Sequence, residues 1–232
     1  MKSARNRSIV VLGLLVMFIV GIVVFTAARK RSSVQRMRED LRGAGDPVLF
    51  TEYATDPIPD EENGYYHLMQ SSEGVRAFSD ALLGIPGIDT QVLFGVPSDL
   101  SPQTLDSLGK WLDEHPEMFE DLRQAAASNK YRPDIDHSEG YGVVATDLSV
   151  LRSATRAIVA RALVLAHRGN GDEALEACGL GFALQQLMQN DPLLVTYLST
   201  IAAQDSFLVA VDHILRTCPT SQAARDELDE VL

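Results

Sequence analysis

The chain has 232 residues, and its charge is divided unevenly along its length. Residues 1–42 hold nine Lys and Arg against two Asp and Glu, whereas residues 43–232 hold 11 against 30, a net charge of −19. A charge of that sign repels nucleic acid and anionic lipid, so the composition argues against a nucleic-acid-binding domain.

The first predicted element is a membrane-spanning helix over residues 9–28. The run IVVLGLLVMFIVGIVVFTAA holds no charge, and twenty helical residues cover about 30 Å, the thickness of a bilayer's hydrocarbon core. A cleaved signal peptide is the alternative, because Thr26-Ala27-Ala28 offers small residues at a cleavage site. Signal-peptide apolar cores are shorter, about 7–15 residues, so the length favours a retained single-pass anchor that places the protein in the cell membrane.

The anchor divides the chain into four predicted parts. They are a basic N-terminal tail (1–8), the transmembrane helix (9–28), a basic juxtamembrane stretch with a Pro-rich strap (29–59) and an acidic helical domain (60–232). A basic tail is hard to export, which favours an extracytoplasmic domain. The cations of residues 29–42, counted alone by the positive-inside rule, favour the opposite orientation.

The first half of the acidic domain shows three predicted helix starts. Asp60 is expected to cap a helix that runs to Leu83, before a Gly- and Pro-rich loop over residues 84–100. Ser101-Pro102 combines a hydroxyl cap with proline at the first helical position. His115-Pro116 restarts the chain into a helix that is expected to end near Asn129, followed by a polar connection over residues 130–141.

The second half has the most regular periodicity. A long helix is predicted from about Asp147, and a turn over residues 169–172 ends it, with Asp172 as the cap of the next helix. Asn190, Asp191 and Pro192 are expected to separate that helix from a third one, and Ser221 to cap a short terminal helix. The apolar stripes predicted for the three long helices are Leu148, Leu151, Thr155, Ile158, Ala162 and Leu165, then Ala174, Leu175, Cys178, Phe182 and Leu187, then Leu194, Leu198, Ile201, Leu208, Val211 and Leu215.

Short turns between long amphipathic helices force neighbouring helices to run antiparallel. We therefore expect an all-α fold: a single N-terminal transmembrane helix followed by an irregular helical bundle or short α-hairpin array.

Two resemblances accompany this prediction. Residues 166–184 (AHRGNGDEALEACGLGFAL) resemble the turn inside a tetratricopeptide-like helical hairpin. The chain as a whole is similar to a group of planctomycete-type proteins with one membrane helix, through the strap at residues 44–48, the helix start at 59–63 and the Tyr-Arg-Pro-Asp turn at 131–134. That resemblance implies a C-terminal helical domain and brings no known activity.

The densest set of potential metal ligands is Asp134, Asp136, His137 and Glu139. The set fails the EF-hand pattern, because His137 and Ser138 stand where the next ligand and its approach should be, so a solvated linker is favoured. The five histidines (His67, His115, His137, His167 and His213) show no zinc spacing. The sequence therefore predicts no metal site.

No catalytic or cofactor motif is recognisable either: G-x-S-x-G, the P-loop and a strand-borne G-x-G-x-x-G are all missing from the sequence. Arg152, Arg156 and Arg161 lie on the long helix, and an intramolecular ion-pair row is favoured over an anion-binding stripe. Two cysteines, Cys178 and Cys218, are too few for a disulfide scaffold, and their expected positions argue against pairing.

These observations favour a membrane-tethered helical protein-interaction domain with no catalytic, cofactor-binding or metal-binding residue. Its expected partners are the lipid bilayer, through residues 9–28, and another protein. One alternative is a membrane-anchored hydrolase with a carboxylate and histidine site in the 130–141 loop, built from Asp134, Asp136 or His137. Another is a purely structural envelope protein. The sequence leaves the partner's identity and the oligomeric state open.

Overall fold

The computed structural model describes residues 36–37, 39–44, 58–85, 88, 100–133, 147–189 and 194–232. The chain forms two compact units, Met1–Thr55 and Asp56–Leu232. In the first unit, residues 36–37 and 39–44 are helical, and Met37 and Leu41 are exposed.

Several predicted features lie outside the described residues. They are the membrane-spanning helix (9–28), the strap before residue 58, most of the 84–100 loop, residues 134–141 of the polar connection, and the turn at residues 190–192. Within the described ranges, no helix is both long enough and apolar enough to cross a membrane.

The second unit confirms the predicted all-α class, since its described residues contain helices and a single isolated bridge between Asn63 and Lys130. The elements are a 3₁₀ helix, η2 (Asp60–Glu62), and the α-helices α2 (Gly64–Gln70), α3 (Ser72–Leu82), α4 (Pro102–Asp113), α5 (Glu117–Ala127), α6 (Asp147–His167), α7 (Gly171–Met188), α8 (Leu194–Thr217) and α9 (Gln222–Val231).

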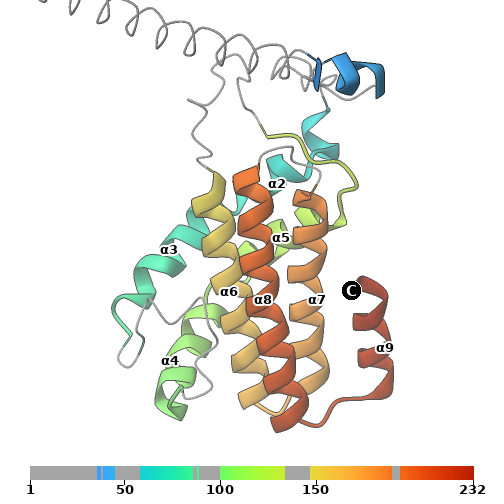
Figure 1. Ribbon diagram of the computed structural model, residues 1–232. Helices are drawn as coiled ribbons and strands as arrows, with labels where there is room; N and C mark the ends of the chain where they lie inside the picture. Colours follow the sequence, from blue (N-terminus) through green and yellow to red (C-terminus); the bar gives the residue numbers. More distant parts are fainter. Residues whose placement is uncertain are drawn as a thin grey trace, which may run out of the picture. The chain divides into compact units, whose positions relative to one another are not determined.

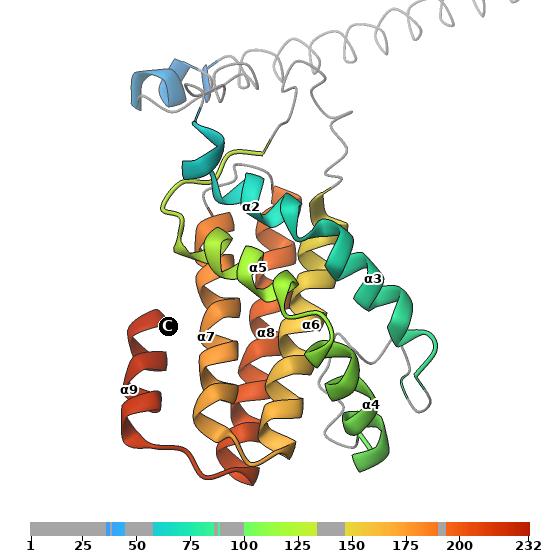
Figure 2. The ribbon, with the colours of Figure 1, turned by 180° about the vertical axis from the view of Figure 1, so that it is seen from behind.

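Three long helices, α6, α7 and α8, lie side by side and form the centre of this unit (Figure 1). Helices α2–α5 lie on the side of the three long helices that faces the viewer in Figure 2, and α9 lies beside α7. Helix α6 packs against α3, α4, α7 and α8, which explains why it is buried along most of its length. Its predicted stripe is confirmed from Leu151 to Leu165, and that of α7 is confirmed throughout.

Two of the predicted helix starts are confirmed by their cap geometry. The Ser101 hydroxyl accepts a hydrogen bond from the Thr104 N–H at 3.2 Å, with Pro102 as the first helical residue. The Ser221 hydroxyl accepts from the Ala224 N–H at 3.1 Å. Gly169 ends α6 with a φ of +81°, a left-handed backbone conformation that glycine adopts without strain.

The prediction of one helix from Asp60 to Leu83 is wrong in two respects. Asp60 begins only a 3₁₀ turn, and the side chain of Asn63 caps α2 by accepting from the Tyr65 N–H at 3.2 Å. The helix then breaks at Ser71, a buried residue whose hydroxyl donates to the Leu68 carbonyl at 2.7 Å. A serine that bonds to the preceding turn favours such a break.

Asn63 also anchors the start of the 130–141 connection. Its Oδ1 accepts from the Arg132 N–H and its Nδ2 donates to the Arg132 carbonyl, both at 2.9 Å. Tyr131 is buried, and its ring meets that of Tyr65 edge to face at 5.9 Å. Residues 130–133 of the predicted polar connection are therefore fixed to the helical core.

The predicted cap role of Asp172 is also wrong. Asn170 occupies the N-cap position of α7 and makes no side-chain cap hydrogen bond, and Asp172 lies in the first turn. The Asp172 Oδ1 instead accepts from the Ser221 N–H at 2.7 Å. This hydrogen bond holds the start of α9 against the start of α7.

Candidate functional site

Helix α8 turns a mixed face towards α6 and α7, in which small and polar side chains accompany Phe207 and Ile214. Its buried residues lie on one side of the helix: Thr196, Thr200, Ala203, Ser206, Phe207, Ala210, Val211 and Ile214. The predicted stripe is therefore wrong for this helix. Among the stripe residues whose side chains are described, only Val211 is buried. The others are exposed: Leu198, Ile201, Leu208 and Leu215.

The orientation of α8 is fixed by Phe207, whose side chain is fully buried against α7. Gly181 lies opposite, and a Cβ at that position would come within 2.3 Å of the Phe207 ring. The same ring packs against Phe182 at a centroid distance of 5.6 Å. The absence of a side chain at Gly181 thus makes the room that turns Phe207 inward.

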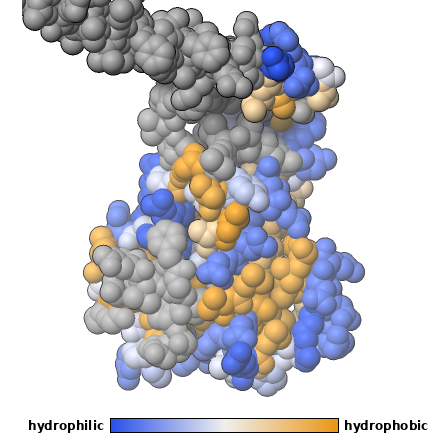
Figure 3. All heavy atoms as spheres, viewed as in Figure 1, coloured by the Kyte–Doolittle hydropathy of each residue, from blue (hydrophilic) through white to orange (hydrophobic). Residues whose placement is uncertain are grey.

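The opposite side of the helix, which we call the α8 outer face, is apolar and exposed. It consists of Val195, Leu198, Ile201, Leu208 and Leu215, whose exposed fractions lie between 46% and 55%. Figure 3 shows hydrophobic residues gathered along α8 on this side. An apolar helix face is normally buried, so the exposure of this one is unusual.

The spacing along this face alternates between three and four residues. Leu198, Ile201, Asp205, Leu208, Asp212 and Leu215 form one seam of this kind. Such spacing keeps one stripe facing a partner helix over several turns. Two aspartates interrupt the seam: Asp212 accepts a hydrogen bond from Arg216 at 2.8 Å, and Asp205 has no ion-pair partner among the described residues.

A groove adjoins the N-terminal part of this face. It has a volume of about 180 Å³ and lies between α6 and α8. Its lining is mostly apolar and includes Leu148, Leu151, Val195, Leu198 and Ala202. The groove extends the apolar surface from α8 onto α6.

The structure does not describe the residues that the sequence singles out as potential ligands. Asp134, Asp136, His137 and Glu139 lie outside the described residues. Within the described ranges, no group of three or more His, Cys, Asp or Glu side chains is placed to hold a metal ion.

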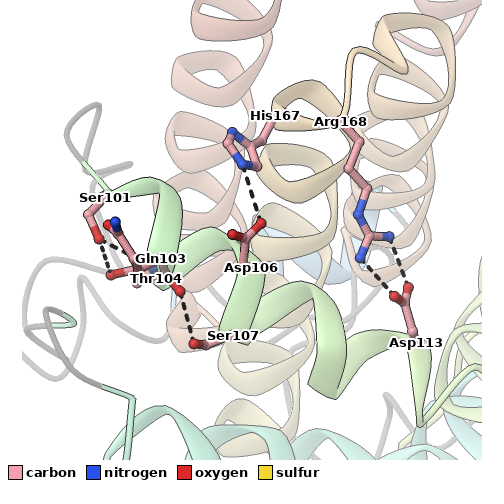
Figure 4. A network of polar contacts seen from close by, with 8 residues as sticks. All are labelled: Ser101, Gln103, Thr104, Asp106, Ser107, Asp113, His167 and Arg168. Atoms are coloured by element: carbon pink, nitrogen blue, oxygen red, sulfur yellow. Dashed lines mark hydrogen bonds and ion pairs between the residues drawn. The ribbon is translucent and has the colours of Figure 1, made fainter.

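Two of the described histidines, His115 and His167, make local contacts. His115 stacks on Trp111 at 3.9 Å and its Nδ1 lies 2.8 Å from the Trp111 carbonyl oxygen. His167, in the last turn of α6, lies 3.5 Å from Asp106, next to the paired hydrogen bonds of 3.0 and 2.7 Å from Arg168 to Asp113 (Figure 4). These exposed contacts join α4 to the end of α6.

Both cysteines and Arg161 lie in the described part of the chain. Cys178 and Cys218 are free, as expected, and both are buried. Burial raises the pKa of the Cys178 thiol to about 12, which makes it unreactive. The predicted ion-pair row is wrong for Arg161, which lies over the Phe119 ring at 4.4 Å and has no ion pair to a described residue.

No protein-family model, curated protein or solved structure matches this chain in the comparisons made.

Proposed function

We propose that residues 56–232 form a protein-interaction domain that binds an amphipathic helix of a partner protein along the α8 outer face. The observation that carries the proposal is the exposed apolar seam with alternating three- and four-residue spacing. Helix-in-groove recognition uses anchors at this spacing, and the groove between α6 and α8 offers a place for one apolar anchor.

The charges on the seam favour a basic partner helix. Asp205 and Asp212 face the occupant between the leucines, and residues 56–232 hold 28 Asp and Glu against 11 Lys and Arg. A second copy of the chain would bring aspartates against the same acidic seam, which costs energy. Lys or Arg beside the apolar residues of a partner helix would instead complement them.

We further propose that residues 9–28 tether this domain to the cell membrane, with the domain outside the cytoplasm. The support is the length and charge-free composition of that segment. The chain should stay in the membrane fraction after alkaline carbonate extraction. Release of the intact chain into the aqueous fraction would contradict the tether and leave the helix-binding proposal standing.

A designed peptide tests the helix-binding proposal directly. The full chain in phosphatidylcholine nanodiscs is titrated with a fluorescent peptide that has leucines at heptad spacing and lysines beside them. We expect saturable binding, measured by fluorescence anisotropy, and no binding of a matched peptide with glutamates in place of the lysines.

Two variants separate the α8 outer face from other apolar surface. L208D should weaken binding at least tenfold, because it puts a charge in the middle of the seam. L83D is the matched control, since Leu83 is an exposed leucine at the end of α3, and it should leave the affinity unchanged. Equal binding by both variants, or equal binding of both peptides, would overturn the proposal.

A further inference from the structure

A second and separate cavity lies between α5, α7 and α9. It has a volume of about 480 Å³, within the range of about 300–1,000 Å³ that small-molecule sites occupy. One part of its lining is apolar and includes Leu180, Ala183, Leu228 and Val231. Helix α5 crosses the central helices, and α9 lies beside α7 (Figure 2).

The side chain of Arg161, on α6, lines this cavity and brings a guanidinium group to it. The guanidinium lies 4.4 Å from the centroid of the Phe119 ring, so a cation–π contact holds its plane in place. No described residue accepts a hydrogen bond from it or forms an ion pair with it. A half-buried, oriented fork of N–H donors therefore borders the cavity without an acceptor among the described residues.

The electrostatics of Arg161 support an anion at this point. Burial first, and then the nearby Arg123, lowers the pKa of Arg161, while Glu176, Glu173 and Asp113 oppose that shift through space. Arginine remains cationic at neutral pH in spite of such a shift. Arg123 lines the same cavity but is already paired with Glu120 at 2.8 Å. Arg161 is thus the cation whose donors remain for a ligand.

The acidic residues that line the cavity disfavour a ligand with more than one negative charge. Asp172, Glu173, Glu176 and Glu227 also line the cavity, and they would repel a dianion such as a phosphate monoester. The acidic residues of α7 lie in its first turns, and Leu180 and Ala183 follow along the same helix. From Glu176 to Ala183 the helix rises about 10 Å, which leaves room for an alkyl chain of medium length.

We propose that this cavity binds a medium-chain alkyl carboxylate, with its carboxylate on the Arg161 guanidinium and its chain on Leu180, Ala183 and Leu228. Arginine matches the planar carboxylate with paired hydrogen bonds, and the apolar walls bury the chain. This site is independent of the α8 outer face and of any protein partner bound there.

The test uses the full chain in phosphatidylcholine nanodiscs, titrated calorimetrically with octanoate, with empty nanodiscs as the blank for partition into lipid. We expect saturable binding at one site. Octanol, which has the same chain without the charge, and octylammonium, which has the opposite charge, should each bind at least tenfold more weakly. Absence of saturable heat above the blank, or equal affinity for octanol, would overturn the proposal.

Three variants locate the site. R161Q should weaken octanoate binding at least tenfold, because it removes a charge-assisted pair of hydrogen bonds. R168Q removes an exposed arginine that does not line the cavity, and should leave the affinity unchanged. A183F keeps Arg161 but fills the apolar part, so it should also abolish binding. Octanoate affinity that is unchanged in R161Q or in A183F would contradict the assignment, and thermal melts establish that each variant is folded.

Discussion

The ring of Phe207 lies directly against the backbone of Gly181, where any Cβ would come within 2.3 Å of it. This single approach sets the rotation of α8 about its axis. Phe207 points inward, and Leu208 and Ile201 lie about 100° and 120° from it around the helix axis, on either side, so both point away from the core. The exposed apolar seam is thus a consequence of a packing contact on the other side of the same helix.

The first prediction concerns this contact. G181A should destabilise the protein by about 1–3 kcal/mol, because the added methyl overpacks the interface and the Phe207 ring must move. Urea-induced unfolding followed by circular dichroism measures the change.

Gly179 provides the matched control for that measurement. It lies in the same helix, and a Cβ there would meet Leu228 at 3.9 Å, an ordinary contact. G179A should therefore leave stability unchanged or raise it by up to about 1 kcal/mol through helix propensity. A larger loss in G179A than in G181A would contradict the packing described here.

A second prediction compares two adjacent residues of α8. Ile214 is fully buried, whereas Leu215 is 47% exposed. I214A should cost about 2–5 kcal/mol, the range for large-to-small core changes, and L215A should change stability by about 0.5 kcal/mol. Thermal melts of both variants distinguish the observed rotation of α8 from the one predicted from its leucines, which would reverse the order.

A third prediction concerns Asn63 and Arg132. N63A leaves the backbone N–H and carbonyl of Arg132 without their side-chain partner, and we expect a loss of about 1–3 kcal/mol in unfolding free energy. N129A is the control, because Asn129 is exposed and directly precedes the 130–141 connection. Equal stability of the two variants would show that Asn63 does not anchor the 130–133 segment.

A fourth prediction concerns the attachment of α9. The backbone N–H and then the hydroxyl of Ser221 hold the pKa of Asp172 below its ordinary value of 3.8. The ionised form is therefore favoured by folding, so this contribution is present above the ordinary pKa and is lost as the pH falls through the lowered value. The protection of residues 222–231 against hydrogen exchange, relative to the intrinsic rate at each pH, should fall on acidification below that point.

D172A should accelerate the same exchange at neutral pH. E173A is the matched control, because Glu173 is the neighbouring acidic residue and makes no hydrogen bond to Ser221. Exchange in α9 that is equally fast in both variants would show that Asp172 does not fasten this helix.

Local signals in the sequence were sufficient for much of the fold. The caps at Ser101 and Ser221, the length of α6 and the stripe of α7 follow from residue types and spacing within one helix. The break at Ser71 and the contact between Asp172 and Ser221 could not be predicted in this way. Each depends on one particular hydrogen bond of Ser71 or Asp172. The same side chain could as reasonably bond to another group of its own helix.

The leucine pattern of α8 predicts the wrong side of this helix as its core face. Leucines at heptad spacing normally mark a core, and the true inner face carries Thr196, Thr200 and Ser206, which look like surface residues. What reverses the assignment is the space left by Gly181, a tertiary relationship between two helices. The position of Arg161 over Phe119 is likewise a contact between helices that no local spacing reveals.

The most direct test of the central claim is site-specific photocrosslinking from Leu208 in native membranes, with Leu83 as the matched control position. We expect crosslinks from Leu208 to map to an amphipathic helix with Lys or Arg beside its apolar stripe, and Leu83 to yield none to that segment. Crosslinks from Leu208 that map to a second copy of this chain, or that match those from Leu83, would contradict it.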